Sequence, residues 1–174
     1  MYIFNSPDII RESAFKKFEE YGTRNALDIG DSMGINIYLR DDFRGLKGMY
    51  SSYLGERSIH VNSNGTTAEQ IMYGGHELGH DIFHQKLAAT FSYFDTDFFV
   101  RDRTEYEANL FDAHLLLDEE QILDLAASGY ELDQIAVMMN TYRELLLIKL
   151  RDMSERGLPV RAAYSPLMNF WSMK

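Results

Sequence analysis

Three histidines stand four residues apart in the stretch MYGGHELGHDIFHQ, and Glu77 directly follows the first of them. On an α-helix successive residues turn by about 100°, so side chains four apart project from nearly the same face. His76 and His80 can then direct imidazole nitrogens at one metal ion, while Glu77 reaches a water molecule beside that ion. This is the HExxH arrangement of zinc hydrolases, and it predicts metal-assisted hydrolysis.

The alternative interpretation of this stretch is a polar helix face on which histidines occur by chance, because five positions make a short motif. Against it, three of the five histidines of the chain lie on this one stripe. Gly79 lies among them, and a glycine in mid-helix costs about 1 kcal/mol relative to alanine. Close packing against a strand would explain that glycine. Leu78, Ile82 and Phe83 supply an apolar side that a core would bury.

His84 has the spacing of a third histidine ligand. Zinc hydrolases with three histidines usually need a turn between the second and the third, and the segment HDIFH has no glycine to make one. We therefore expect His84 either beside the site, in contact with a ligand, or at the surface. His60 and His114 are expected in the core or at the surface rather than on the metal.

A catalytic zinc takes three protein ligands and leaves one position for water, so another residue has to come from elsewhere in the chain. A later helix with an isolated acidic residue on an apolar face is the place to look. The stretch RTEYEANLFDAHLLLDEEQI offers Glu105, Glu107 and Asp112. Helix geometry separates these three carboxylates.

Counting about 100° per residue from Glu105, Asn109 falls near 40° and Asp112 near 340°, so the three form one stripe. Glu107 and His114 fall near 200° and 180°, on the predicted solvent face. Glu105 is therefore the predicted third ligand. Asn109 and Asp112 are predicted to hydrogen-bond the far ring nitrogens of the two ligand histidines. The alternative role for Glu105 is a cap at the start of its helix.

The elements that must position these residues can be predicted from capping and turn residues. Ser6 before a proline and Gly22 bound a first helix, and a second helix is expected over 24–33. The β-branched and aromatic run at 35–39 predicts a buried strand. The segments on either side of a short Gly-Glu turn at 55–56 predict an antiparallel hairpin that extends the sheet.

The histidines belong to the next predicted element. Thr66 and Glu69 form a capping-box pattern that opens a helix running through residue 85. From residue 103 the chain is predicted to be helical almost to residue 156, with breaks near 117–118 and 129–130. The apolar tail over 156–174 is interrupted by two prolines, so we expect it to pack along the body of the protein.

Composition limits the classes of protein to which the chain can belong. With 174 residues, of which 45% are hydrophobic, it can bury one substantial core, so we expect a single domain over 1–174. The net charge of −10 makes nucleic acid and anionic membranes poor partners. The chain has no cysteine, which excludes disulfides and thiolate ligands. No signal peptide or bilayer-spanning run is evident, so a cytoplasmic location is expected.

Two of these stretches together resemble a known family. HELGHDIFH followed by RTEYEANLFDAHLLLDEEQI resembles the ImmA/IrrE family of HExxH metallopeptidases, whose pattern runs HELGH, a spacer, then E-x-x-A-N-x-F-A-x-x-L-L and commonly Met-Pro. This sequence departs from that pattern in two places. Asp112 stands where the family usually has alanine, and Leu117-Asp118 replaces Met-Pro.

The resemblance extends on both sides of the two motifs, over roughly residues 25–155. Upstream, GMYSSYLGERSIHVNSN is similar to the family's glycine-containing strand followed by an Ile-x-x-Asn segment. Downstream, LDQIAVMMNTYRELLLIKLRDM is similar to its C-terminal helical pair. The fold class it implies is α+β: a mainly helical, zincin-like single domain with a small antiparallel sheet beside the HExxH helix.

The resemblance also implies an activity. Family members are zinc-dependent endopeptidases, often encoded by phages and mobile elements, that cut a partner transcriptional repressor. We therefore expect one zinc ion per chain on His76, His80 and Glu105, with Glu77 accepting the proton of the attacking water and passing it to the leaving amine. Tyr73 is a candidate donor to the oxyanion, its alternative role being that of a core aromatic residue.

Two other functions compete with this one. A binding module on the same fold would capture a repressor or another protein without cutting it, and would have no need to keep Glu77 basic. A DNA-binding regulator would use the helices over 131–156, but their basic residues are offset by acidic ones. The ligand set also suits manganese, iron or nickel.

Overall fold

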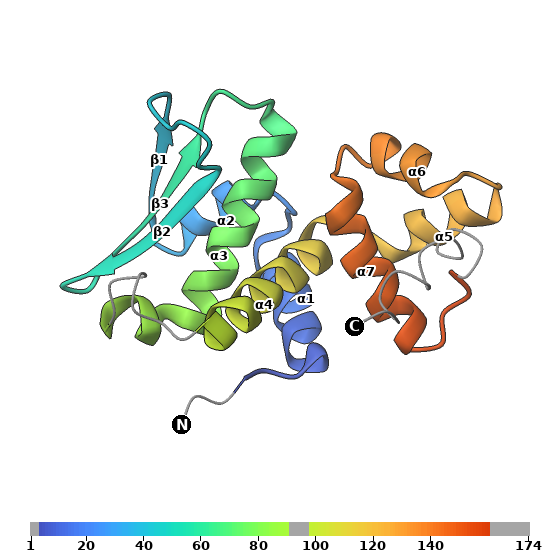
Figure 1. The fold of residues 1–174 in the computed structure, drawn as a ribbon, viewed down its shortest axis with the longest axis horizontal. Helices are drawn as coiled ribbons and strands as arrows, with labels where there is room; N and C mark the ends of the chain where they lie inside the picture. The colour runs from blue at the N-terminus through green and yellow to red at the C-terminus, as the bar shows by residue number, and fades with distance from the viewer. Residues whose placement is uncertain (1–3, 91–97, 161–174) are drawn as a thin grey trace. The chain divides into compact units, whose positions relative to one another are not determined.

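The computed structural model describes residues 4–90 and 98–160, and the chain divides into two compact units, Met1–Leu116 and Leu117–Lys174. We describe each unit by itself. The described residues of the first unit form four helices and three strands: α1 (Pro7–Tyr21), α2 (Ala26–Ser32), β1 (Asn36–Arg40), β2 (Gly48–Tyr53), β3 (Glu56–Asn62), α3 (Thr67–Thr90) and α4 (Phe98–Leu116). This is the predicted α+β class, mainly helical with a small sheet (Figure 1).

The capping residues bound the helices as predicted. The Ser6 hydroxyl accepts a hydrogen bond from the backbone of Ile9, and Gly22 ends α1 in the left-handed conformation, at φ 65°. At the start of α3 the Thr66 N–H donates to Glu69 Oε2 at 2.7 Å, while the Glu69 N–H donates to Thr66 Oγ1 at 3.3 Å. This reciprocal pair confirms the capping box that opens the histidine helix.

The sheet has the strand order β1-β3-β2. The hairpin of β2 and β3 is antiparallel, as predicted, but β1 pairs with β3 in parallel, so the sheet is mixed rather than wholly antiparallel. The parallel pairing follows from the number of times that the chain reverses direction between β1 and β3. The chain turns back once before β2 and again before β3, so β3 runs in the direction of β1 and enters the sheet between the other two strands.

The prediction of a buried strand at 35–39 was wrong in part. β1 is an edge strand in which Tyr38 is 48% exposed and Leu39 58% exposed, whereas Ile35 just before it is buried. An apolar run predicts a strand but does not reveal whether another element covers both of its faces.

The core of this unit surrounds α3, which packs against the sheet and against α4. Ile59 and Val61 of β3 are buried, as is Leu78 on the side of α3 opposite the histidines. In Figure 1, α3 runs alongside the sheet and α4 crosses α3, in agreement with their contacts. Gly79 meets the backbone of Ala108 on α4, so the close neighbour of this glycine is a helix and not the strand we predicted.

Helix α4 is packed between α3 on one side and α1 on the other. Its buried apolar residues therefore surround the helix: Ala108, Leu110, Phe111, Ala113 and Leu115. The prediction of a solvent face carrying Glu107 and His114 was wrong, because these residues are 0% and 6% exposed. A helix covered on both sides has no such face.

The second unit contains α5 (Glu119–Ala127), α6 (Leu132–Met138) and α7 (Arg143–Glu155). The predicted breaks near 117–118 and 129–130 are present. A third break follows Met138 and separates the two helices of the C-terminal pair that the resemblance implied. Asn140 adopts φ 50° there, a left-handed conformation that asparagine tolerates.

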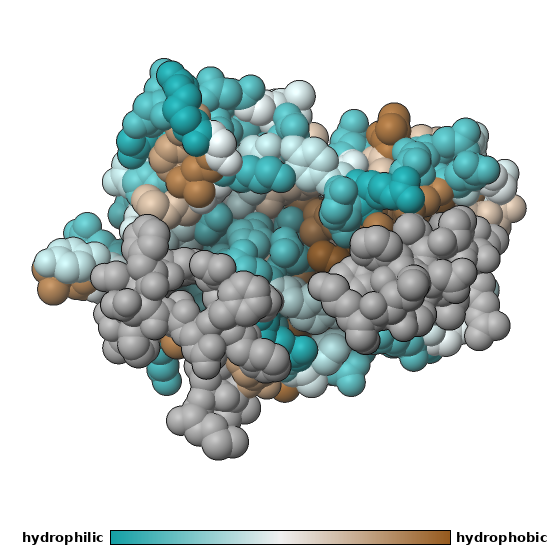
Figure 2. Space-filling view, in the orientation of Figure 1, coloured by the Kyte–Doolittle hydropathy of each residue, from teal (hydrophilic) through white to brown (hydrophobic). Residues whose placement is uncertain are grey.

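The described surface in Figure 2 is largely hydrophilic over the sheet and α3. No helix among the described residues is long and apolar enough to cross a membrane. The predicted packing of the tail falls mostly on 161–174, which lie outside the described residues. Val160, just before them, is buried.

Candidate metal centre

Helices α3 and α4 bring three of the predicted residues together. His76 and His80 come from α3 and Glu105 from α4, and their ligand atoms all lie within 4.8 Å of one another. His76 Nε2 is 3.1 Å from His80 Nε2 and 3.1 Å from Glu105 Oε2. His80 Nε2 is 3.4 Å from Glu105 Oε1. Since α4 begins at Phe98, Glu105 lies well inside the helix and does not cap its start.

These separations fit a small divalent metal. Ligand atoms about 2.0–2.1 Å from a tetrahedral zinc ion are separated from one another by roughly 3.3 Å. The three separations in the site are close to that value. Two imidazole nitrogens and one carboxylate oxygen are also the ligand set of catalytic zinc in several hydrolases, with a fourth position left for water.

The protonation states of the two histidines are compatible with binding of a metal cation. Burial lowers the pKa of His80 to about 4, so its imidazole is neutral near pH 7, the form that binds a metal. Burial also acts to lower the pKa of His76, but its hydrogen bond with Glu105 and the charge of Glu77 raise it to about 9. A metal ion would therefore replace the proton shared by His76 and Glu105.

Glu77 lies on the sheet side of the site, where strand β2 holds its carboxylate. Glu77 is buried, and the backbone N–H of Tyr50 acts to lower its pKa. Burial raises the pKa of Glu77 to about 7; the charge of Glu105 acts in the same direction, and His76 opposes it. A carboxylate with a pKa near the working pH is suited to both accepting and returning a proton.

Gly48 on β2 provides the space that Glu77 occupies, and we predict that Gly48→Ala slows catalysis without disturbing the metal. A Cβ at this position would lie 2.7 Å from Glu77 Oε1 and 2.9 Å from Glu77 Cγ. The methyl group would displace the carboxylate from its position beside the site. Displacements of this kind can cost about 100-fold in rate.

The measurement for Gly48→Ala is kcat/KM on a cleavable partner, together with zinc content. We expect a fall of about 10- to 100-fold with an unchanged zinc content. Met49→Ala on the same strand is the matched control. The Met49 side chain is 42% exposed and points to the face of the strand opposite to that of Gly48, away from Glu77. An unchanged rate in Gly48→Ala would show that β2 does not position Glu77.

The far ring nitrogens of the two histidines have different partners. His76 Nδ1 is 2.9 Å from Asn109 Oδ1, a neutral amide oxygen. His80 Nδ1 is 2.9 Å from Nδ1 of His84, which is buried behind it. Such partners hold a ligand ring in one orientation and one tautomer. Asn109 and His84 therefore lie where they can orient the two predicted ligands.

Two further predicted residues lie away from these nitrogens. Asp112 is almost one turn beyond Asn109 on α4, which takes its carboxylate past the histidines to Gly75. The partners of the two Nδ1 atoms are Asn109 and His84, so Asp112 does not make the predicted hydrogen bond to His76 or His80, and its Oδ1 has no hydrogen-bond partner among the described residues. Tyr73 lies one turn before the HExxH motif, with Lys47 Nζ 5.8 Å from the centre of its ring. Its role as an oxyanion donor stays a prediction.

Sequence reasoning missed Glu107 as part of this region. Its carboxylate is buried and lies 3.3 Å from His84 Nε2. The available signal was the composition of α4, whose apolar residues recur on all sides, which is typical of a fully buried helix. A carboxylate in such a helix needs partners.

Comparisons with known proteins agree with this geometry. A family model described as the IrrE N-terminal-like domain matches residues 31–151, more than half of the chain. Uncharacterized immunity region protein 2 of Bacillus phage phi105 is 31% identical over 147 residues, 84% of this chain and 91% of that protein. Metallopeptidase ImmA of Bacillus subtilis (strain 168) is 27% identical over 135 residues, 75% of this chain and 78% of that protein.

The matched region contains α3 and α4 and thus every residue of the candidate centre. A model that spans this much of the chain, together with a relative above 30% identity over most of both lengths, establishes the relationship. The chain belongs to the ImmA/IrrE family of metallopeptidases.

Proposed function

We propose that this protein is a zinc-dependent endopeptidase that hydrolyses a peptide bond in a protein partner, a phage or mobile-element transcriptional repressor. The observation that carries the proposal is the convergence of three ligand atoms from His76, His80 and Glu105 beside the buried carboxylate of Glu77. One zinc ion per chain would be held by these three residues. Other divalent metals suit the same ligands.

The chemistry divides between the metal and the protein. A bound zinc ion supplies Lewis-acid activation of water and of the scissile carbonyl. Glu77 accepts a proton from the attacking water, and the same carboxyl group returns that proton to the amine that leaves. Gly48 on β2 leaves the space that the Glu77 carboxylate occupies beside the site. Asn109 and His84 hold the ligand rings in orientation.

The choice of a repressor as substrate rests on relatives. One of them is named as a phage immunity region protein and another as metallopeptidase ImmA. A partner of this kind is a protein, which agrees with the net charge of −10 that disfavours direct contact with DNA.

The second candidate function is a binding module that holds a repressor without cutting it. The environment of Glu77 favours the enzyme. A binding surface has no need for a buried carboxyl group with a pKa of about 7 next to three convergent ligand atoms.

The proposal is tested with the purified protein and the repressor encoded on the same genetic element. We expect about one zinc ion per chain, cleavage of the repressor into two fragments, loss of cleavage on treatment with a chelator, and recovery when zinc is added. The control is an unrelated folded protein of similar size, which should stay intact. Less than about a tenth of an equivalent of zinc, with no binding on titration, would defeat the metal centre.

A further inference from the structure

A line of buried polar groups runs from His80 away from the metal side of the candidate centre. His80 Nδ1 is 2.9 Å from His84 Nδ1, and His84 Nε2 is 3.3 Å from Glu107 Oε2. All three side chains are buried, Glu107 completely. The line crosses from α3 to α4 and reaches a carboxylate on the side of α4 opposite Glu105.

The chemistry of a metal ligand assigns the direction of these hydrogen bonds. His80 Nε2 faces His76 and Glu105, so it needs a free lone pair to bind a metal, and the ring proton of His80 then stays on Nδ1. That proton is donated to His84 Nδ1, which must be the acceptor. The proton of His84 then lies on Nε2 and is donated to Glu107. Both rings are neutral in this arrangement, and the charge lies on the carboxylate.

Glu107 is held from the other side by the residue that precedes α1. The Asn5 backbone N–H donates to Glu107 Oε1 at 3.0 Å, and Asn5 Nδ2 donates to Oε2 at 2.9 Å. These bonds span 102 positions of the sequence. Asn5 lies outside residues 31–151, the part of the chain that the family model matches.

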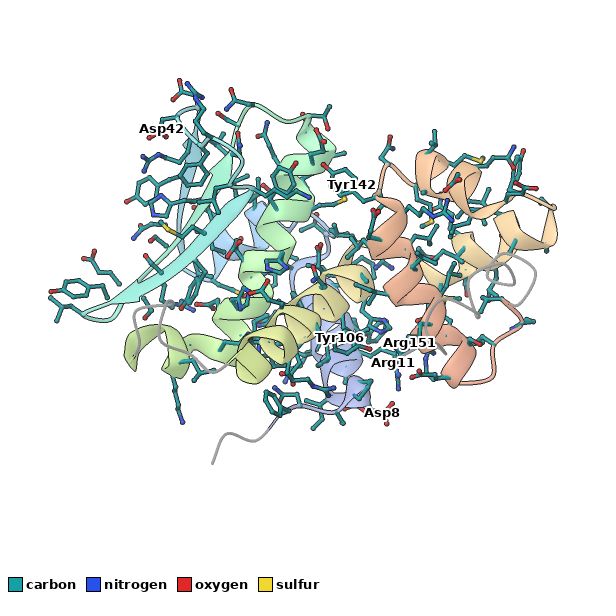
Figure 3. The ribbon with its side chains drawn as sticks, in the orientation of Figure 1. Asp8, Arg11, Asp42, Tyr106, Tyr142 and Arg151 are labelled. Carbon is teal, nitrogen blue, oxygen red and sulfur yellow. The ribbon has the colours of Figure 1, made fainter. Side chains whose placement is uncertain are left out.

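Arg103 completes the surroundings of this carboxylate. Its Nε donates to Glu107 Oε1 at 3.4 Å, and its Nη2 donates to the carbonyl oxygen of Asn5 at 3.4 Å. Its guanidinium group lies 5.7 Å from the ring centre of Phe4 and 5.4 Å from that of Tyr106, which Figure 3 labels on α4. Arg103 therefore hydrogen-bonds both the segment before α1 and the Glu107 carboxylate, and its guanidinium group lies near two aromatic rings.

We infer that Glu107, anchored by Asn5, is a positioning residue that orients His80 for metal binding through His84. The inference rests on the proposed zinc site and deepens it. Its first consequence is that the two ligand histidines are unequal, because His76 has a neutral amide as its partner while His80 is linked to an anion. Its second is that the segment before the first helix belongs to the support of the metal centre.

The main test is the affinity for zinc, measured by competition with a chelator. Glu107→Gln keeps the size of the side chain but removes its charge and one of its acceptors, so we expect zinc binding about 10-fold weaker, within the 10- to 100-fold range typical of such partners. Asn5→Ala should weaken binding in the same direction by a smaller factor, since the backbone N–H of residue 5 remains. Ser6→Ala is the matched control, because it removes the cap of the same helix without touching Glu107.

A second measurement distinguishes a positioning role of Glu107 from a purely structural one. It determines the tautomers of the His84 and His80 rings by ¹⁵N imidazole NMR. We expect the proton of His84 on Nε2 in the metal-free wild-type protein and the proton of His80 on Nδ1 in the zinc-bound protein. A His84 proton on Nδ1 would overturn the inference, and so would unchanged zinc affinity in both Glu107→Gln and Asn5→Ala.

These outcomes remain distinct from failure of the proposed function. If the wild-type protein binds no zinc, the proposed function fails, and the tautomer of His84 still reports on the hydrogen bond to Glu107. If Glu107→Gln does not fold, Asn5→Ala against Ser6→Ala decides the question. Equal zinc affinity in those two variants would overturn the inference.

Discussion

Replacing Glu77 by glutamine is expected to abolish cleavage of the partner while zinc content stays near one ion per chain. The amide of glutamine has nearly the same shape as the carboxyl group, but it cannot accept the proton of the attacking water. Removing a general base typically costs 10²–10⁴-fold in rate, so we expect a loss of at least about 10³-fold. The measurements are the cleavage rate by mass spectrometry of the fragments and the zinc content of the same sample.

The matched control for Glu77→Gln is Glu56→Gln, which makes the same change of charge at an exposed position on β3. Cleavage at a comparable rate by Glu77→Gln would show that another group is the base. If the wild-type protein binds a partner but cuts none, the binding-module function takes the lead.

Replacing Glu105 by alanine is expected to weaken zinc binding by more than about 100-fold, because loss of a ligand should exceed the 10- to 100-fold cost of losing a residue that only orients one. Loss of the carboxylate leaves two histidine ligands and removes the negative charge that faces both of them. The measurement is a metal titration with a competing chelator.

Glu107 cannot serve as the control for Glu105, although sequence geometry suggested it. It is buried and linked to His84, so its replacement is expected to affect zinc as well. Glu12→Ala on α1 is the appropriate control, because that carboxylate is exposed. A titration in which Glu105→Ala binds zinc as tightly as wild type would overturn the ligand assignment.

Local patterns predicted most of the first unit. Ser6, Gly22 and the pair of Thr66 and Glu69 bound helices because capping is an interaction among residues three or four apart. The shared face of His76 and His80 follows from helix geometry alone in the same way. Each of these features is determined within one element.

What could not be predicted depends on contacts between distant segments. The parallel entry of β1 beside β3 depends on the path of the chain over two reversals. The burial of Glu107 depends on α1 and α3 covering opposite sides of α4. The contact of Asn5 with Glu107 joins the two ends of the first unit, and no periodicity within either helix contains it.

The close approach of Gly79 and Ala108 sets the span of the metal centre. A Cβ at Gly79 would lie 2.9 Å from the Ala108 Cα, so any larger residue would force α3 and α4 apart. His76 and His80 belong to α3 and Glu105 belongs to α4. Because metal–ligand bonds are about 2 Å long, the distance between the two helices can increase only slightly before a ligand is lost. Two residues without functional groups thus fix the spacing of the two helices, and with it the distance between the histidines and the carboxylate that completes the ligand set.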